Sequence, residues 1–542
     1  MAARLVRRRP LRYGHRVPGR ERHRAVLRVG LGLLAVSACK SPAEKATPAA
    51  RGEVATPPSV AAKSVAEAPP ASAAPPAVSA PASSAEPTPA PPEPRVYVKA
   101  RFVWVRPTPS GEGQWLGFLW TGSSVRLKST EPRSGPGCRT FYAIEPEGYV
   151  CVDGERATLD PNDPVYRALV PFAPRADAPQ PHPFYGESIG VERYFEPPRP
   201  EHQRRRERDL AAHLADVARA REGNVSKRLT GVDLGVPTAE PPSFPPLPRR
   251  FFEPRDRLKA RSTVSYSLEA RFGDRGFLLS GDYAWMPKDR VIPYPKVTFH
   301  GLRLPEDAEL PLAFFRGKDR PKYVRAADGS FSANGAFPRL GWVALTGKSE
   351  RWNEERYLET KEAGVWVRER DAVLPQERKR TPWGAPVGGK DETGARRRKW
   401  LEIAIDEGWL LAYDGTRPVY ATLMSPGRGG AARPGEDPLE RAASPVGTYS
   451  INGKFVTATM VDPGELVLSD VPFAQNIVGP YAIHAAYWHD NWGRPQSGGC
   501  INLSPVDAKW LFDFTDPPMP EGWHGIRLLP SQHVPTIVVL RP

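Results

Sequence analysis

The sequence predicts a mainly β protein, and two features of the chain support this. Short segments in which apolar and polar residues alternate recur from residue 95 onward, and turns rich in Gly and Pro separate them. The first 94 residues differ in composition, because an arginine-rich start is followed by a long segment of Ala, Pro, Ser and Glu. We therefore expect several β-rich modules behind an N-terminal region that builds no core.

Residues 1–39 are predicted to be an export signal. Ten arginines stand against one glutamate in residues 1–38, so +9 of the formal net charge of +15 precedes or flanks an apolar run. That run ends in small residues before Cys39, which resembles the lipobox of bacterial lipoproteins and implies that Cys39 is lipidated. The alternative is a basic nucleic-acid-binding arm. It is disfavoured, because such an arm is rarely followed by an apolar run that ends at a cysteine.

Residues 40–94 are predicted to be a disordered linker. Their Ala, Pro, Ser and Glu content leaves almost no large apolar residue, so the segment cannot bury enough surface to offset chain entropy. A partly polyproline spacer of this length reaches on the order of 100 Å. No apolar stretch of about 20 residues occurs elsewhere, so we expect no transmembrane helix.

Residues 95–175 are predicted to form a small β-barrel, since many short strands with frequent turns are typical of one. The order of these strands resembles a bacterial Src-homology-3-like domain. Its aromatic residues either line a peptide groove or fill the barrel, and the second interpretation is favoured. They are Trp104, Trp115, Trp120 and Tyr142.

The chain has only four cysteines, and Cys138 and Cys151 are predicted to form a disulfide. Export permits disulfides, and the two residues enclose a segment of hairpin length. The alternative is a pair of reduced cysteines in a small β core. With Cys39 lipidated and this pair closed, Cys500 is the thiol that remains for chemistry.

The middle of the chain is less informative. Residues 176–255 read as a proline-rich connecting segment with one helix at residues 206–221, whose apolar face would hold Leu210, Leu214 and Val217. Short strands return in residues 256–385, where segments 283–291 and 364–373 look alike. This similarity indicates one or two further modules of the Src-homology-3-like kind.

A histidine and a cysteine near the C-terminus form the strongest motif. His484 ends an apolar strand pattern, and Cys500, sixteen residues later, follows a glycine turn and precedes a second apolar strand. This arrangement is typical of a thiolate nucleophile with its base. Two strands are predicted upstream of this motif, at residues 400–406 and 409–413. With these strands and the motif, residues 398–542 resemble the L,D-transpeptidase (YkuD-type) family.

The resemblance implies a β-sandwich-like catalytic domain with assigned roles. Cys500 would be the nucleophile, His484 the base, and the Ala485 carbonyl would orient the base. The backbone amides of Gly499 and Cys500 would bind the oxyanion, and such donors are worth about 3 kcal/mol each. The residues expected to contact substrate are Tyr487, Trp488, His489, Ser497, Gly498 and Asn502.

Gly498 departs from the family pattern, because a histidine usually stands there. His489 could compensate from its loop, although a role in the substrate groove or in the structure is favoured. The departure keeps open a catalytically impaired, non-enzymatic peptidoglycan-binding tether. Two further alternatives use the same thiol: an L,D-carboxypeptidase, with water as the acceptor, and a peptidoglycan hydrolase, which would cleave crosslinks.

The expected function is that of a cell-wall lipoprotein enzyme. By resemblance, the thiolate attacks the third residue of a peptidoglycan tetrapeptide stem, and a neighbouring stem or a protein lysine resolves the thioester. The expected partners are peptidoglycan stem peptides, the membrane through the N-terminal lipid, and a protein acceptor as an option, but no nucleic acid. We expect the periplasmic face of the cell envelope, with the outer membrane favoured. No zinc-ligand spacing, phosphate loop or dinucleotide fingerprint is visible, so no cofactor or metal is expected.

Overall fold

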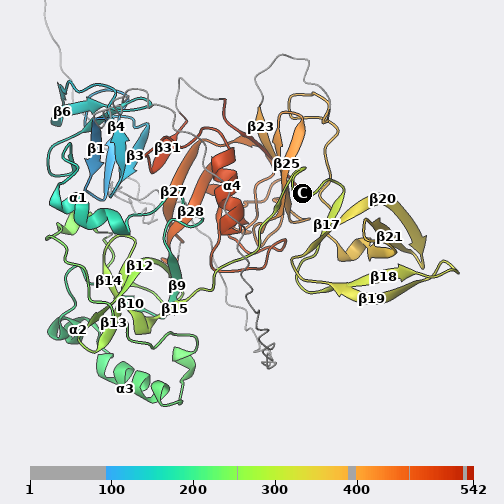
Figure 1. Ribbon diagram of the computed structural model, residues 1–542, viewed down its shortest axis with the longest axis horizontal. Helices are drawn as coiled ribbons and strands as arrows, with labels where there is room; N and C mark the ends of the chain where they lie inside the picture. Colours follow the sequence, from blue (N-terminus) through green and yellow to red (C-terminus); the bar gives the residue numbers. More distant parts are fainter. Residues whose placement is uncertain (1–92, 253, 389–397, 463, 529–533) are drawn as a thin grey trace, which may run out of the picture. The chain divides into compact units, whose positions relative to one another are not determined.

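The computed structural model of the protein describes residues 93–252, 254–388, 398–462, 464–528 and 534–542. In this part of the chain the fold is mainly β, as expected (Figure 1). The predicted export signal with Cys39, and the predicted linker up to residue 92, lie outside the described residues. No helix within the described ranges is long and apolar enough to cross a membrane.

Eight short strands follow residue 94. They are β1 (Arg95–Val98), β2 (Phe102–Val105), β3 (Gly117–Trp120), β4 (Ser124–Arg126), β5 (Arg133–Gly135), β6 (Cys138–Ala143), β7 (Tyr149–Cys151) and β8 (Ala157–Thr158). Successive side chains along a strand point to opposite faces of the sheet. Accordingly Val96, Val98, Val103 and Val105 are buried, whereas the residues between them are partly exposed. The strand positions expected from the alternating pattern are therefore confirmed.

The expected closed barrel is wrong for residues 95–175. Strand β3 pairs on one side with β2 and on the other with β31 (Gly525–Arg527), within a sheet of twelve strands. Glycines allow this close approach, because a Cβ atom added to Gly117 would lie 2.3 Å from the Gly525 carbonyl oxygen. The described strands form several sheets and no closed barrel. The resemblance to a Src-homology-3-like module is not confirmed.

The aromatic residues of this region lie mostly outside its aliphatic core. All four are partly exposed, so the interpretation that most of them fill a barrel is wrong; they are Trp104, Trp115, Trp120 and Tyr142. Trp120 stacks on His524, with ring centroids 4.8 Å apart. Burial lowers the pKa of His524 to about 3, so the stacked imidazole is neutral at pH 7. The aromatic face of β2 and β3 therefore joins this region to the C-terminal part of the chain.

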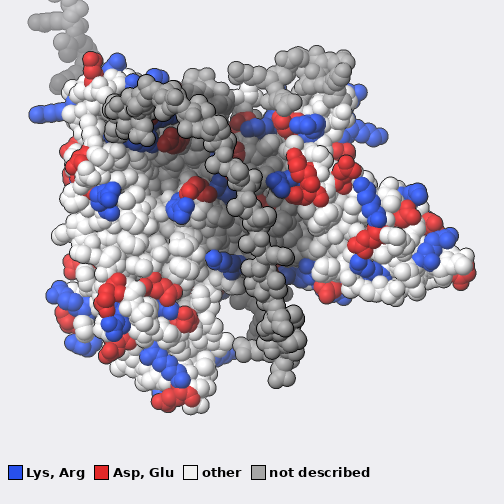
Figure 2. All heavy atoms as spheres, viewed as in Figure 1, with Lys and Arg blue, Asp and Glu red and all other residues white. Residues whose placement is uncertain are grey.

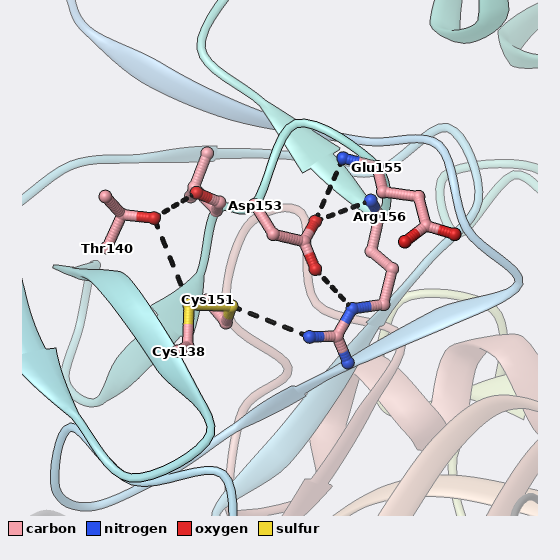
Figure 3. The surroundings of a disulfide bond; sticks show 7 residues. Cys138, Thr140, Cys151, Asp153, Glu155 and Arg156 are labelled. Atoms are coloured by element: carbon pink, nitrogen blue, oxygen red, sulfur yellow. Dashed lines mark hydrogen bonds and ion pairs between the residues drawn. A yellow bond between two sulfur atoms is a disulfide. The ribbon is translucent and has the colours of Figure 1, made fainter.

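Cys138 on β6 and Cys151 on β7 form a disulfide bond, with Cα atoms 6.0 Å apart (Figure 3). The two strands are antiparallel neighbours, so the bond crosslinks a pair that backbone hydrogen bonds already join. Arg156 lies against the sulfur atoms, since its Nη2 is 3.6 Å from Cys151 Sγ. The Arg156 Nε donates to Asp153 Oδ2 at 2.7 Å, which fixes the guanidinium in this position.

The connecting segment contains two helices where one was expected. They are α2 (Pro200–Arg206) and α3 (Leu210–Arg221), and a further helix, α1 (Pro164–Leu169), precedes the segment. The expected start at residue 206 is wrong, because the backbone is extended at Glu207. The Glu207 carboxylate turns inward and accepts hydrogen bonds from Arg275 and Arg290 at 2.6–2.9 Å. The face of α3 that is buried holds His213, Val217 and Ala220, whereas Leu214 is exposed.

The strands in the middle of the chain fall into two groups, and within the first group β10 and β11 form a separate two-stranded sheet. The first group is β9 (Phe184–Ser188), β10 (Val191–Glu192), β11 (Arg257–Leu258), β12 (Thr263–Phe272), β13 (Arg275–Ser280), β14 (Trp285–Pro287) and β15 (Val291–Pro293). The second group is β17 (Leu312–Phe314), β18 (Arg320–Arg325), β19 (Phe331–Phe337), β20 (Trp342–Trp352), β21 (Glu355–Thr360) and β22 (Val365–Arg368). The second group forms an open sheet of six strands, so here too the expected barrel is absent from the described strands.

The two similar segments of the sequence have the same local structure. Strand β14 leads into a 3-10 turn at Lys288–Arg290, and β22 leads into one at Glu369–Asp371. One segment lies in each of the two groups of strands, so the similarity reflects a shared strand-turn unit. On the face shown in Figure 2, basic and acidic side chains are interspersed over β18–β21, where ion pairs such as Arg325 with Glu350 occur.

The C-terminal region contains two facing sheets and one helix. Its elements are β16 (Leu302–Arg303), β23 (Lys399–Ala404), β24 (Trp409–Asp414), β25 (Arg417–Leu423), β26 (Gly447–Ser450), β27 (Gly453–Val461), β28 (Val467–Val478), β29 (Tyr481–Ala485), β30 (Ile501–Leu503), α4 (Pro505–Phe514), β31 and β32 (Ile537–Arg541). The hairpin expected around residues 407–408 is confirmed, since Ala404 pairs with Trp409. Six strands run in the order β16-β25-β24-β23-β32-β26.

The core of this region lies between the six-stranded sheet and β27–β30. Leu401 and Ile403 of β23 point into it and join Phe473, Ile483 and Ile501 from the opposite sheet. The residues of β23 that alternate with them, Trp400 and Ala404, enter a second core on the outer face. Helix α4 packs on β28, beside which it lies in Figure 1, and on β29. The six-stranded sheet is therefore covered on both faces by these two cores. This packing holds in place the facing strands that carry the motif residues.

Candidate functional site

His484 lies on β29 and is completely buried. Its Nδ1 is 2.9 Å from the Ala485 carbonyl oxygen, which can only accept a hydrogen bond. Nδ1 therefore carries the hydrogen of the neutral ring, and Nε2 keeps a lone pair. The Nε2 atom is buried and has no hydrogen-bond partner among the described residues. The geometry around the predicted base thus leaves one nitrogen ready to take up a proton.

Cys500 immediately precedes β30, which lies beside β29. The two strands are parallel, with Ile483 opposite Ile501 and His484 opposite Asn502. The Cys500 thiol is buried, and its Sγ is 3.9 Å from the Pro480 carbonyl oxygen just before β29. The predicted base therefore lies on a strand that is hydrogen-bonded to the one following the predicted nucleophile, with His484 opposite the second residue after Cys500.

The turn before Cys500 requires glycine at position 499. Gly499 has a φ of +136°, and an added Cβ atom would lie 2.5 Å from Cε1 of Tyr481. The Ser444 hydroxyl donates to the Gly499 carbonyl oxygen at 2.9 Å. A side chain at this position would therefore displace the turn that carries the thiol.

Ser497 stabilises the same turn through two hydrogen bonds of its hydroxyl group. Its hydroxyl donates to the Cys500 carbonyl oxygen at 2.6 Å and accepts from the Gly499 N–H at 3.0 Å. Ser497, predicted to contact substrate, thus has a structural role in this conformation. The Gly499 N–H is engaged by Ser497, so its predicted contact with an oxyanion requires this hydrogen bond to break. Gly498, between them, is buried.

His489 lies beside the base and contacts Asn502. Its Nε2 is 3.2 Å from Asn502 Nδ2, and its Nδ1 accepts from the Asn491 N–H at 3.3 Å. Burial lowers the pKa of His489 to about 3, so the ring is neutral at pH 7. A neutral ring that accepts at Nδ1 donates at Nε2. The Asn502 Oδ1 atom, which is buried without a partner in the described residues, is then the acceptor expected to face it.

Tyr487 and Trp488 have different surroundings, although both were predicted to contact substrate. The Tyr487 hydroxyl bonds to Thr263 Oγ1 at 2.6 Å and donates to the Ser469 carbonyl oxygen at 2.7 Å. Its ring stacks on that of Tyr185. Trp488 lies closer to the chemistry, with its ring centroid 6.0 Å from that of His484. Tyr487 therefore ties the loop to β9 and β12, and Trp488 borders the base.

Asp507 is a buried residue near the turn that the sequence analysis missed. As expected, Ser504 caps α4, and its hydroxyl accepts from the Asp507 N–H at 3.1 Å. The Asp507 carboxylate accepts from Tyr420, Thr422 and the Gly301 N–H, each at 2.7 Å. Burial raises the pKa of this carboxyl. The capping-box spacing of Ser504 and Asp507 is the signal that could have indicated it.

A cavity of about 720 Å³ lies beside the loop that follows His484. Residues 487–490 form one wall, and the other walls come from residues 294–302 and from Arg339, Leu340 and Trp342. The sequence analysis assigned no site to these segments, because no local motif marks them. The described residues hold no group of three or more His, Cys, Asp or Glu side chains that could bind a metal ion.

A protein-family model described as the L,D-transpeptidase catalytic domain, YkuD, matches residues 398–527. Residues 398–527 form an L,D-transpeptidase catalytic domain. The L,D-transpeptidase domain includes His484, Cys500 and the glycine turn, and it ends with β31, the strand that pairs with β3. The motif that suggested the family thus lies inside the matched segment.

Solved L,D-transpeptidase structures are similar to the chain at low identity. One from Xylanimonas cellulosilytica is 24% identical, covers 28% of this chain and 65% of its own, and has a TM-score of 0.19. One from Mycobacterium smegmatis is 18% identical, with coverages of 37% and 82% and a TM-score of 0.21. One from Stackebrandtia nassauensis is 18% identical, with coverages of 28% and 60% and a TM-score of 0.18.

The chain spans less than two thirds of the length of the first of these structures. TM-scores this low establish no common fold for the whole chain, so the assignment of the L,D-transpeptidase domain rests on the family model. No curated protein matches the chain.

Proposed function

We propose that the chain is a cell-wall lipoprotein that transfers a peptidoglycan tetrapeptide stem, through a thioester on Cys500, to an amine acceptor. The observation that carries the proposal is the placement of His484 on β29 and of Cys500 immediately before the adjacent β30, inside the L,D-transpeptidase domain. The acceptor is a neighbouring stem, which gives a crosslink, or a lysine of a protein.

In the acylation step, the Cys500 thiolate attacks the carbonyl carbon of the third stem residue. A C–S bond forms, the C–N bond to the terminal D-alanine breaks, and the leaving amine takes the proton that His484 received from the thiol. The role of His484 is supported by its Nε2, which is buried without a partner in the described structure, and by the Ala485 carbonyl that fixes the ring.

In the second step, an amine attacks the thioester carbonyl. A C–N bond forms, the C–S bond breaks, and the proton of the amine passes to His484 and then to the departing thiolate. Water in place of the amine would make the enzyme a carboxypeptidase. The buried site favours transfer to a bound amine, because the thiol and the base are shielded from solvent.

Cys39 is the proposed lipid attachment site, and the linker to residue 94 would let the enzyme reach the wall from its membrane. This part of the proposal is supported by the sequence pattern alone. The proposed location is the periplasmic face of the outer membrane.

Intact-protein mass spectrometry of the full-length chain with a tetrapeptide muropeptide tests the proposal. We expect a mass gain equal to the donor minus D-alanine, or crosslinked dimers, and neither product with Cys500→Ala. Ser444→Ala is the matched control, since it weakens the turn but leaves the thiol in place. It should slow the reaction without abolishing the adduct.

A non-enzymatic tether is the second candidate, and Gly498 is the observation that favours it, because the family usually has a histidine there. The tether predicts that the muropeptide binds and that neither adduct nor product forms, even at long incubation. That result would contradict the proposed enzymatic function and support the tether.

A further inference from the structure

The cavity beside the base is built largely by residues outside the L,D-transpeptidase domain. Residues 487–490 supply one wall, and the segment at residues 294–302 and the β19–β20 connection supply the rest. Its volume of about 720 Å³ lies in the range of pockets that bind small ligands and peptide side chains.

One side chain, that of Trp488, lies between the cavity and the candidate base, and neither His484 nor Cys500 is among the residues that line the cavity. Trp488 lines it, and the ring of Trp488 is 6.0 Å from that of His484. His489 lines it as well and contacts Asn502, the residue opposite His484 in the strand register. A ligand in this space would therefore lie on the side of the base, against Trp488 and His489.

The charged groups of the cavity favour an anion. Arg339 pairs with Asp490, with Nη2 and Oδ1 2.9 Å apart, so these two charges compensate each other. Lys296 is exposed and has no ion-pair partner among the described residues. One positive charge remains in the lining, where it would attract a carboxylate.

The aromatic residues of the cavity suit a peptide. The side chain of Trp342 on β20 remains 40% exposed, which is high for tryptophan, and it stands with Tyr294 and Trp488 around the same space. Large exposed aromatic side chains are typical of surfaces that bind a partner.

From these observations we infer that the cavity is the subsite for the acyl acceptor, and that Lys296 binds a carboxylate of that acceptor peptide. The inference rests on the proposed function, which supplies the thioester that the acceptor amine attacks. The amine must transfer its proton to His484 as the C–N bond forms and the C–S bond breaks, so it has to approach from the side of the base. The cavity lies on that side of the base, and Trp488 separates it from the ring of His484.

Two acceptor peptides with the same amine, one ending in a carboxylate and one in a carboxamide, test the inference. With the full-length chain, we expect the carboxylate to be preferred about fivefold in kcat/KM, the effect of one exposed ion pair. Lys296→Glu should remove the preference and Lys296→Arg should keep it. Lys227→Glu, at an exposed lysine far along the chain from the cavity, should leave it unchanged.

Acylation is measured separately by the mass of the Cys500 adduct, which these variants should leave unaltered. Loss of acylation in Lys296→Glu would assign the cavity to the donor and overturn the inference. An unchanged preference in Lys296→Glu would overturn it as well.

A measurement of peptide binding makes the test independent of catalytic turnover. The carboxylate peptide is titrated into full-length Cys500→Ala by calorimetry, with and without Lys296→Glu, and we expect about a fivefold increase in Kd. An unaltered chain that forms no adduct would overturn the proposed function alone. Peptide binding that is independent of Lys296 would overturn the inference alone.

Discussion

Tyr487 stacks on Tyr185 with ring centroids 3.9 Å apart, three residues after the candidate base. The Tyr487 hydroxyl also bonds to Thr263 and to the backbone of Ser469, so one side chain joins the loop after β29 to β9, β12 and β28. The loop after β29 is thus anchored both within the L,D-transpeptidase domain, by β28, and outside it, by β9 and β12.

Tyr487→Phe keeps the stacked ring but removes two buried hydrogen bonds. Because Thr263 and the Ser469 carbonyl then lose a partner, we expect the free energy of unfolding to fall by about 1–3 kcal/mol. Chemical denaturation measures this change. Tyr142→Phe, at a half-buried tyrosine away from the loop, is the control and should have a smaller effect; an equal loss in both would argue against the anchoring role.

Gly499→Ala should disrupt the turn before Cys500. Both the φ of +136° and the 2.5 Å approach to Tyr481 oppose a side chain, and we expect a cost of about 2 kcal/mol or more with loss of the acyl adduct. Gly154→Ala separates the two causes, because Gly154 has a φ of +76° but nothing within 4 Å of the added Cβ. Thermal unfolding and adduct formation are compared; equal stability losses would show that the contact with Tyr481 is unimportant.

His489→Gln should leave the pH dependence of acylation in place. Since burial lowers the pKa of His489 to about 3, the ring does not change charge between pH 5 and 9 in the folded protein. The rates are measured over this range. The ionisations seen in the unaltered chain should persist in the variant with a lower overall rate, and the disappearance of one of them would assign it to His489.

Lys454 should make stability rise with pH. Burial lowers its pKa to about 7, and its Nζ donates to the Thr515 carbonyl oxygen at 2.8 Å. Between pH 7 and the ordinary lysine pKa, the unfolded chain binds more protons than the folded one, so the free energy of unfolding increases with pH in this window. The effect is absent below pH 7, where both states are protonated. Urea denaturation at pH 7 and pH 9 measures it, and Lys454→Met should remove the slope.

Arg275→Met should destabilise the packing of α2 and α3 on the sheet. Arg275 pairs with Glu207 and Asp289 in the interior, and the loss of one partner from a buried network costs about 3–5 kcal/mol. Arg271→Met is the matched control, because its pair with Glu240 is exposed and should contribute far less to stability. Similar losses in the two variants would contradict the importance of burial.

The sequence allowed the prediction of local features and of one motif. The strands of residues 95–151, the hairpin around residues 407–408 and the helix cap at Ser504 follow from patterns within a few residues. His484 and Cys500 could be found because their spacing and glycine turn are unusual and functionally specific.

Features that depend on distant segments could not be predicted. The pairing of β3 with β31 joins residues about 400 positions apart. Because of this pairing, β3 belongs to a larger sheet and the barrel predicted from local patterns does not form. The helix break at Glu207 depends on Arg275 and Arg290, whose positions only the fold supplies. For the same reason, no local pattern indicated that Lys296, Arg339 and Trp342 line one cavity with Trp488.

The strand pair β3 and β31 limits where the chain can be cut. Gly117 and Phe118 cover one edge of β31, and β27 covers the other, so a fragment that starts at residue 398 would present an unpaired strand edge to solvent. Bare edges of this kind recruit other chains. The residues recognised by the family model are thus unsuited to expression as a separate fragment. In the full chain, β3 covers this edge and prevents self-association through it.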